Sequence, residues 1–222
     1  MSTVLAIETS VPEATIVVWR DGGLVSEHDF SVGRNHNAMV FEALENALAV
    51  LGGGQLDLVV VGTGPGSYSG TRVGIAVGQG LAIAHGCPAI GLGSFAATSL
   101  ARLSQPAVAV GDARRGVFFV SPIEENGEAA AVELMGRTEF LERLRRLEGM
   151  ALFTFDDPEA LDLDDDLKSR IVRARPEARL LVDVWNGLSV ERQNALTRTP
   201  LAPTYLRAPF TSKAKAGHPL LR

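Results

Sequence analysis

A glycine-rich segment between a buried strand and a helix constrains the fold of this chain more than any other feature. Residues 64–72 read Gly-Pro-Gly-Ser-Tyr-Ser-Gly-Thr-Arg and follow the apolar run at 57–62. Such an unbroken run is typical of a strand buried on both faces. Because glycine admits positive φ and close backbone approach, the segment can turn tightly into a helix, whose first N–H groups favour an anion. The sequence therefore predicts a strand–loop–helix unit, which either binds a phosphate or is a tight connection without a ligand.

The loop matches neither of the common phosphate-binding fingerprints. No lysine precedes a serine or threonine after the glycines, as a Walker A loop requires, and the G-x-G-x-x-G spacing of dinucleotide-binding loops is absent. The candidates for holding a nucleotide or phosphate are Gly64, Gly66, Ser67 and Gly70 in this loop, Glu8, Thr9 and Ser10 after the first apolar run, and Asp112 in the second half of the chain. Thr9 and Ser10 are explained more simply as caps of a turn, since short Ser/Thr turns are common.

The same order of predicted elements occurs twice along the chain. In the first half, apolar runs at 4–8, 14–19 and 24–30 predict an antiparallel meander, followed by a helix at 35–51, the strand at 57–62 and a helix at 71–85. In the second half, strands at 107–111, 116–121 and 129–134 precede a helix at 138–147. This duplication, in a chain of 222 residues, predicts an α/β protein of two lobes.

We place the expected boundaries of the two lobes from the same pattern. The first lobe is expected at residues 1–104, a smaller second lobe at 105–210, and a mobile tail at 211–222. The strongly acidic segment at 156–166 is expected to be a solvated loop.

Composition excludes several classes of function. The net charge of -5 and a pI near 5.4 give no basic surface of the kind that binds nucleic acid by itself. The four histidines are scattered, with no close ligand pair, so no metal site is predicted. The single cysteine, Cys87, suits a small core residue better than a nucleophile. No signal-peptide pattern and no long uncharged apolar segment is present, so we expect a cytoplasmic protein without membrane contact.

Two glycines inside the second predicted helix indicate close packing. Gly74 and Gly78 lie four residues apart, and each costs a helix about 1 kcal/mol relative to alanine. We interpret this cost as the requirement of a close approach to another helix or strand, either in the protein's own core or at an interface. The first helix, at 35–51, is amphipathic, with apolar residues at spacings of three and four and Asn35 or Asn37 as its cap.

Several motifs, taken in their order along the chain, resemble those of the TsaB family, also called YeaZ. They are Ala6–Ser10, Arg34–His36, Gly64–Gly74, Asp112–Arg115 and Pro203–Arg207. The glycine loop is the most specific of these, and residues 137–200 show little of the family pattern. The family belongs to the superfamily of acetate and sugar kinases, heat-shock ATPases and actin. The resemblance therefore implies two ribonuclease H-like lobes, with mixed sheets flanked by helices.

The resemblance also implies a partner subunit that is not an enzyme by itself. TsaB-like proteins pair with the catalytic subunit TsaD, which transfers threonylcarbamoyl to adenosine 37 of tRNA, and the ATPase TsaE binds the pair. Contact with tRNA is then indirect, ATP or ADP is a candidate ligand at the partner interface, and the chain alone is expected to form a homodimer. TsaD carries two metal-binding histidines where this chain has Ser94 and Thr98, so neither that metal site nor metalloprotease activity is expected.

We expect the helices at 37–51 and 71–85 to form the interface with the TsaD-like partner. Small residues allow close backbone approach, and apolar side chains of the other helix would fill the interface. The expected interface residues are Arg34, His36, Val40, Leu44, Leu48, Thr71, Arg72, Gly74, Ile75 and Gly78.

The competing hypothesis is a small ATP-dependent phosphotransferase or ATPase. In that case Glu8, the glycine loop and Asp112 would surround a nucleotide. Two departures from the family pattern weaken such a site: Glu8 stands where an aspartate is usual, and Gly116 follows Arg115 where an acidic residue is frequent.

Overall fold

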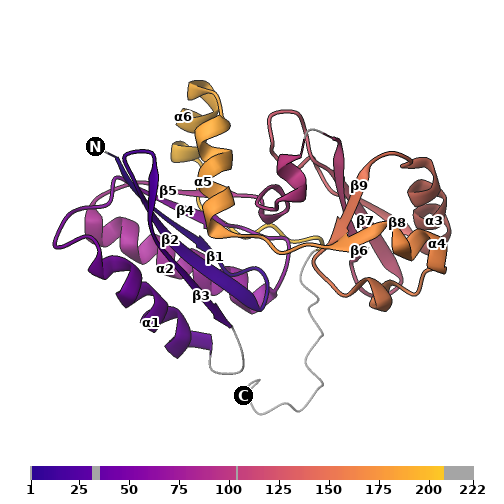
Figure 1. Cartoon of the computed structure of the whole chain (residues 1–222), viewed down its shortest axis with the longest axis horizontal. Coiled ribbons are helices and arrows are strands. Elements are labelled where there is room, and N and C mark those ends of the chain that lie inside the picture. Colours follow the sequence, from indigo (N-terminus) through magenta and orange to yellow (C-terminus); the bar gives the residue numbers. More distant parts are fainter. Residues whose placement is uncertain (1, 32–35, 104, 208–222) are drawn as a thin grey trace, which may run out of the picture.

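The first lobe is a five-stranded mixed sheet with helices on both faces. The computed structural model describes residues 2–31, 36–103 and 105–207. The elements of this lobe are β1 (Thr3–Glu8), β2 (Glu13–Arg20), β3 (Gly23–Ser31), α1 (His36–Ala49), β4 (Leu58–Gly62), α2 (Tyr68–His85) and β5 (Ala89–Leu92). The strand order is β3-β2-β1-β4-β5, with β1–β2 and β2–β3 antiparallel and β1–β4 and β4–β5 parallel. The predicted meander and the following helix–strand–helix order are confirmed (Figure 1).

The second lobe repeats this topology. Its elements are β6 (Ala107–Asp112), β7 (Val117–Pro122), β8 (Glu133–Gly136), α3 (Arg137–Arg146), β9 (Ala151–Thr154), α4 (Asp165–Ser169) and β10 (Ile171–Arg173). The strand order is β10-β9-β6-β7-β8, again with an antiparallel meander and two parallel pairs. The predicted fold class, two related α/β lobes with mixed sheets flanked by helices, is therefore confirmed.

Local sequence explains why the central elements form. All six residues of β1 and all five of β4 are buried, as expected of parallel strands covered on both faces. Helix α2 begins three residues earlier than predicted, because the Ser67 hydroxyl accepts a hydrogen bond from the Gly70 N–H at 3.2 Å and caps the helix. The helix ends at Gly86, whose φ of 66° is the left-handed conformation that favours glycine.

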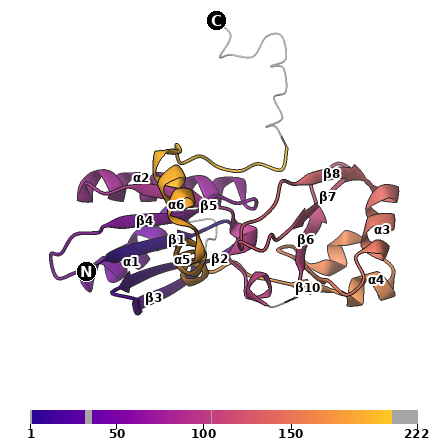
Figure 2. The same cartoon turned by 90° about the horizontal axis from the view of Figure 1, so that it is seen from above.

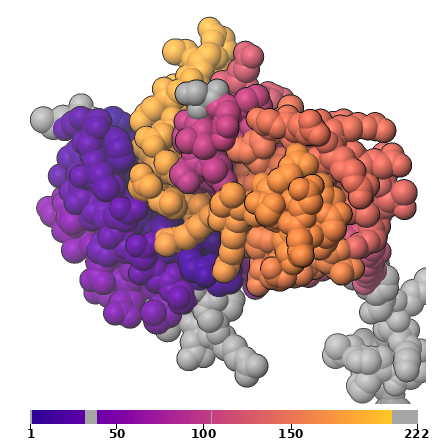
Figure 3. Space-filling model, turned by 45° about the vertical axis from the view of Figure 1, so that its right-hand side comes forward, coloured from indigo at the N-terminus to yellow at the C-terminus, as the bar shows by residue number. Residues whose placement is uncertain are grey.

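The predicted lobe boundaries are wrong at the C-terminal side. Helices α5 (Ala178–Gly187) and α6 (Val190–Arg198) lie within the range expected for the second lobe. Residues Leu181, Val184 and Leu196 of these helices pack instead with Val4, Ala6 and Val60 on one face of the first sheet, while α1 and α2 cover its other face. Figure 2 and Figure 3 show the two C-terminal helices against the first lobe. The second lobe, β6 to β10, is therefore inserted into the first.

Two predictions about the second lobe also need correction. The strand expected at 129–134 forms later, at 133–136, and Ala129 makes only an isolated bridge with Ile123. The acidic segment at 156–166 is structured, because Asp157 and Asp164 cap the short helices that follow them. Their side chains accept hydrogen bonds from the backbone N–H groups of Glu159 and Leu167.

Ion pairs join the lobes at their boundary. Arg173 pairs with Glu13 at 3.6 Å, and Arg175 pairs with Asp29. Arg192 of α6 makes a two-pronged contact with the Glu128 carboxylate, with nitrogen–oxygen distances of 2.7 and 2.9 Å. Among the described residues, the helices are all too short or too polar to span a membrane.

Candidate functional site

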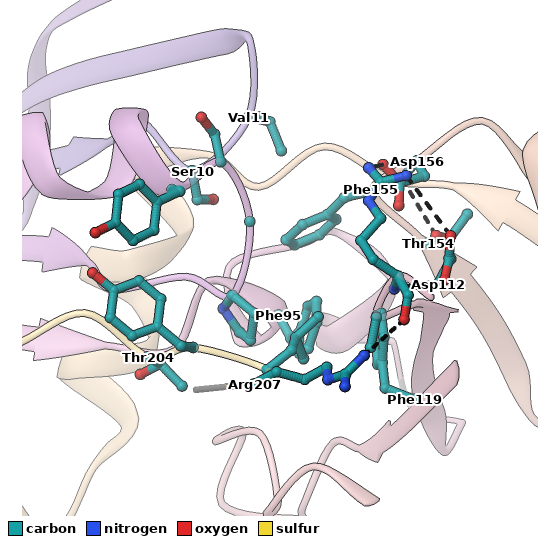
Figure 4. A pocket seen from close by; sticks show the side chains of 18 of the residues that line it. Ser10, Val11, Phe95, Asp112, Phe119, Thr154, Phe155, Asp156, Thr204 and Arg207 are labelled. Atoms are coloured by element: carbon teal, nitrogen blue, oxygen red, sulfur yellow. Dashed lines mark hydrogen bonds and ion pairs between the residues drawn. The ribbon is translucent and has the colours of Figure 1, made fainter. Parts of the chain in front are cut away.

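A pocket of about 510 Å³ lies in the crevice between the two lobes. Its first-lobe wall includes Ser10, Val11 and the start of α2, and its second-lobe wall includes Asp112, Thr154 and Asp156. Figure 4 shows these two sets of side chains on opposite sides of the pocket. The aromatic rings of Phe95, Phe119 and Phe155 complete the lining, and the Phe95 ring lies 5.3 Å from that of Phe119 and 5.0 Å from that of Phe155.

The crevice brings together only some of the residues predicted to hold a nucleotide or phosphate. Ser10, Gly66, Ser67 and Asp112 line the pocket. Glu8, Thr9, Gly64 and Gly70 are buried behind it. Thr9 donates a hydrogen bond from its hydroxyl to the Gly70 carbonyl at 2.9 Å, which fits the simpler prediction of a structural turn.

Glu8 is fully buried and faces the interior of the first lobe. Its Oε1 accepts a hydrogen bond from the Ser10 backbone N–H at 2.7 Å, whereas Oε2 has no hydrogen-bond partner among the described residues. Burial raises the pKa of Glu8 above its ordinary value of 4.5, even though Ser10 hydrogen bonds favour the charged form. The Glu8 carboxyl group therefore stays protonated to a higher pH than an exposed glutamate does. It also lies outside the lining of the pocket.

The backbone of the turn at residues 8–10 packs directly against the glycine loop. A β-carbon added to Gly66 would lie 2.2 Å from the Ser10 carbonyl oxygen, and one added to Gly70 would lie 2.2 Å from the Thr9 carbonyl oxygen. The Ser67 N–H already donates to the Ser10 carbonyl at 2.6 Å. The glycines are thus required for close packing of this loop on the turn at residues 8–10. This arrangement matches the second of the two predicted roles, a tight connection.

The loop at residues 112–116 carries the charge of the second wall. Arg114 and Arg115 have φ values of 70° and 60°, a conformation unusual for residues with a β-carbon. The Asp112 carboxylate accepts a hydrogen bond from the Arg114 N–H at 2.6 Å. The Arg114 guanidinium lies 3.7 Å from Asp112 and 4.0 Å from Asp156. The pocket is therefore lined by acidic and basic groups together with the aromatic rings of Phe95, Phe119 and Phe155.

Ser94 and Thr98, the two residues expected to replace metal-binding histidines, have structural roles here. Both side chains are fully buried. The Ser94 hydroxyl accepts a hydrogen bond from the Gly64 N–H at 3.0 Å, and the Thr98 hydroxyl donates to the Phe95 carbonyl and accepts from the Ala101 N–H. Among the described residues, no group of three or more His, Cys, Asp and Glu side chains is arranged to hold a metal ion.

The residues predicted for the partner interface mostly lie in the core of the first lobe, so this part of the prediction is wrong. Val40, Leu44, Thr71, Gly74, Ile75 and Gly78 are buried, and Leu48 is partly buried against the same core. The apolar stripe of each helix covers the chain's own sheet, which explains the burial. Arg72 is exposed on α2. Arg34, and the side chain of His36, lie outside the described residues.

Other side chains form the outer faces of α1 and α2. On α1, Met39 and Phe41 are 41% and 61% exposed, and on α2 Ile83 is 84% exposed. Gly80 also faces outward, with no described heavy atom within 4 Å of an added β-carbon. These positions lie between the buried ones in the helical repeat. Sequence reasoning passed over them because it followed the apolar stripe and the first two glycines.

Two duplicated lobes around a central crevice define this chain as a protein of the ribonuclease H-like class that includes actin and the sugar kinases. A family model described as TsaD, tRNA N6-adenosine threonylcarbamoyltransferase, matches residues 16–149. The chain belongs to this family, and within it to the TsaB (YeaZ) branch.

Individual relatives agree with this assignment. The chain is 32% identical over 94 residues to the tRNA threonylcarbamoyladenosine biosynthesis protein TsaB of Escherichia coli, covering 41% of this chain and 40% of that protein. It is 29% identical over 127 residues to the Haemophilus influenzae TsaB, covering 54% of this chain and 53% of that protein. The alignments thus span about half or less of these relatives.

A solved structure supports the fold over a longer range. YeaZ from Pseudomonas aeruginosa superposes with a TM-score of 0.68 over 93% of this chain and 100% of that chain. The sequence identity of that match is 21%, so it supports the fold alone.

Proposed function

We propose that this chain is a non-catalytic partner subunit of a TsaD-type threonylcarbamoyltransferase, acting in the formation of N6-threonylcarbamoyladenosine at position 37 of tRNA. The proposal is supported by membership of the TsaB branch and by relatives named for threonylcarbamoyladenosine biosynthesis. The single structural observation that carries it is that α1 and α2 each expose large apolar side chains: Met39 and Phe41 on α1, and Ile83 on α2.

That surface has the properties of a helix-docking face. Phe41 and Ile83 are large apolar residues with more than half of their surface exposed. Ala76 and Gly80, four residues apart on the outer side of α2, are small and exposed, so another helix can approach the backbone closely. Arg72 supplies a charged group at the edge of this face, as is common at protein interfaces. The partner we propose is the TsaD-type subunit.

The remaining contacts are part of the same proposal. A TsaE-type ATPase would bind the pair, with ATP or ADP at the interface, and tRNA would be reached through the complex. In the absence of the partner, the same apolar face would associate with a second copy of the chain. The net charge of -5 favours this indirect route to tRNA, since phosphate binding depends on basic surfaces.

Reconstitution tests the proposal. Threonylcarbamoylation of tRNA would be assayed with the TsaD-type and TsaE-type subunits, with this chain added or omitted. We expect the modification to depend on the chain and the chain to co-elute with the TsaD-type subunit. Full activity without the chain would refute the proposal.

A further inference from the structure

Residues 200–207, which we call the strap, follow α6 and cross the crevice between the lobes. The near end of the strap is held on the first lobe. There the Thr204 N–H donates to the Thr63 carbonyl at 2.8 Å, and the Gln79 side chain donates to the Leu201 carbonyl at 3.3 Å. The far end reaches the second lobe, where the Arg207 guanidinium donates to the Arg114 carbonyl at 2.9 Å. Figure 2 shows the strap running from α6 toward the second lobe.

The strap forms part of the wall of the pocket. Thr204, Tyr205, Leu206 and Arg207 all line the 510 Å³ cavity, next to Pro65 and Phe95. A second cavity of about 310 Å³ is also lined by Pro65, Phe95 and Thr204, together with Glu128 and Arg192. Thr204 of the strap thus lines both cavities. Figure 4 shows Thr204 and Arg207 beside the first of them.

One aromatic pair holds the middle of the strap to α2. The rings of Tyr68 and Tyr205 stack with their centroids 5.3 Å apart and their planes at 24°. Tyr68 is in the first turn of α2 and is 53% exposed, and its hydroxyl accepts a hydrogen bond from Arg72 at 2.7 Å. These are the only two tyrosines in the sequence. The pair therefore connects the pocket wall with an exposed arginine on the outer face of α2.

From these contacts we infer that residues 205–207 are a lid on the interlobe pocket, and that Tyr68 holds the lid closed. The two ends of the strap differ in attachment. Residues 201–204 have hydrogen bonds between their backbone and the first lobe, whereas residues 205–207 are held by the tyrosine stack, by partly buried Leu206 against the cluster of Phe95, Ala113 and Phe119, and by an exposed hydrogen bond from Arg207. We therefore expect residues 205–207 to open before residues 201–204, which lifts Leu206 from the cluster that contains Ala113 and Phe119 on the second-lobe wall.

The inference goes beyond the proposed partner role, because it concerns the isolated chain. If the lid opens as inferred, the contacts of Tyr68 and Arg72 on the outer face of α2 control access to the pocket. Opening the lid requires no rearrangement of either sheet, since the strap lies outside both.

A buried cysteine in the pocket measures lid opening. Ala113 lines the pocket and is 7% exposed, so an Ala113→Cys substitution in a Cys87→Ser background gives a thiol whose reaction with Ellman's reagent requires an open lid. Removal of the ring in Tyr205→Ala is expected to raise the labelling rate roughly two- to tenfold, the range that one aromatic stack contributes to an equilibrium. Tyr68→Ala is expected to do the same, whereas Tyr68→Phe and Tyr205→Phe, which keep the stack, leave the rate unchanged.

A matched thiol separates lid opening from general unfolding. Ala109→Cys lies in β6 with its side chain fully buried, and its labelling reports opening of the second lobe itself. We expect the tyrosine variants to leave its rate unchanged. Equal acceleration at both positions, or no acceleration at position 113, would overturn the inference.

Fluorine NMR gives a second readout that depends on the stack. Labelling with 3-fluorotyrosine yields two resonances, which Tyr68→Phe and Tyr205→Phe assign. In Arg207→Ala, which removes the far attachment, both resonances are expected to move toward the value of free fluorotyrosine. Resonances that already lie at that value in the unsubstituted chain would show that the lid is open without any substitution.

Discussion

A β-carbon added to Gly78 of α2 would lie 2.4 Å from Cγ2 of Val61 on β4. Helix α2 therefore rests on the sheet at a distance that only glycine permits at this position. Two residues further along the same helix, Gly80 has no described heavy atom within 4 Å of such a β-carbon. Position 78 therefore has no room for a side chain, whereas position 80 of the same helix has open space for one.

The first prediction compares these two positions. Gly78→Ala is expected to lower the free energy of unfolding by about 1–3 kcal/mol, because the added methyl group overpacks a buried contact. Gly80→Ala is expected to raise it by about 1 kcal/mol, because alanine is the better helix former and has open space there. Urea unfolding of both variants measures the difference. Equal effects of the two substitutions would contradict the packing described for α2.

The second prediction concerns the buried carboxyl group of Glu8. Because its folded-state pKa is raised above 4.5, its stabilising contribution is present below that pH and is lost as the pH rises through the folded-state value. Glu8→Gln, which keeps the shape and removes the charge, is expected to be more stable than the natural chain at neutral pH by about 1–3 kcal/mol. The difference disappears under acidic conditions.

Thermal unfolding across the pH range checks this expectation. Glu148→Gln, at an exposed position after α3, is the control, and it should follow the natural chain at every pH. A Glu8→Gln variant with a constant difference in stability from acidic to neutral pH would show that charge burial is not the cause.

The third prediction tests the outer face of α2 in complex formation. Ile83→Glu places a charge on a side chain that is 84% exposed, so the fold should tolerate it, whereas an apolar interface should not. We expect loss of co-elution with the TsaD-type subunit and a corresponding loss of tRNA modification. Val190→Glu on α6, at 67% exposure, is the matched control and should leave both unchanged. If both variants behave alike, the interface lies elsewhere.

The fourth prediction concerns the ion pair between Glu128 and Arg192. It joins the second lobe to α6, with the side chains 19% and 48% exposed, so solvent weakens it. A double-mutant cycle with Glu128→Ala and Arg192→Ala is expected to give a coupling of about 0.5–1 kcal/mol in the free energy of unfolding. The coupling should decrease at high salt. A coupling that salt does not change would indicate packing of the arginine side chain in place of charge attraction.

The strands of the first lobe were predictable because burial on both faces leaves an uninterrupted apolar run. Residues 4–8 and 57–62 show this pattern and form β1 and β4 within one or two residues of the predicted bounds. The glycine loop was also predictable as a tight connection, because several glycines close together in the sequence indicate close backbone packing. Gly66 and Gly70 do pack against a neighbouring turn at distances that leave no room for a β-carbon.

Relations between distant segments could not be read in the same way. An amphipathic pattern shows which side of a helix is buried, but not which sheet or protein covers it. Val40 and Ile75 were therefore assigned to a partner although the chain's own sheet buries them. Residues 178–198, which form α5 and α6, were assigned to the second lobe with the rest of 105–210, because order along the chain does not show which sheet a segment covers. The burial of Glu8 depends on how the glycine loop closes on the turn after β1, which is a tertiary contact.

The inserted second lobe and the strap together determine how the lobes can move. The chain passes covalently between the lobes before β6 and after β10, and two such crossings define a hinge axis. The hydrogen bond from Arg207 to Arg114 ties the lobes together as well, beside the ion pairs of Arg173, Arg175 and Arg192. Rotation about the hinge must therefore stretch or release the strap. A chain truncated before Thr204 would lose this tie, and the wider lobe rotation that results could be detected by small-angle scattering.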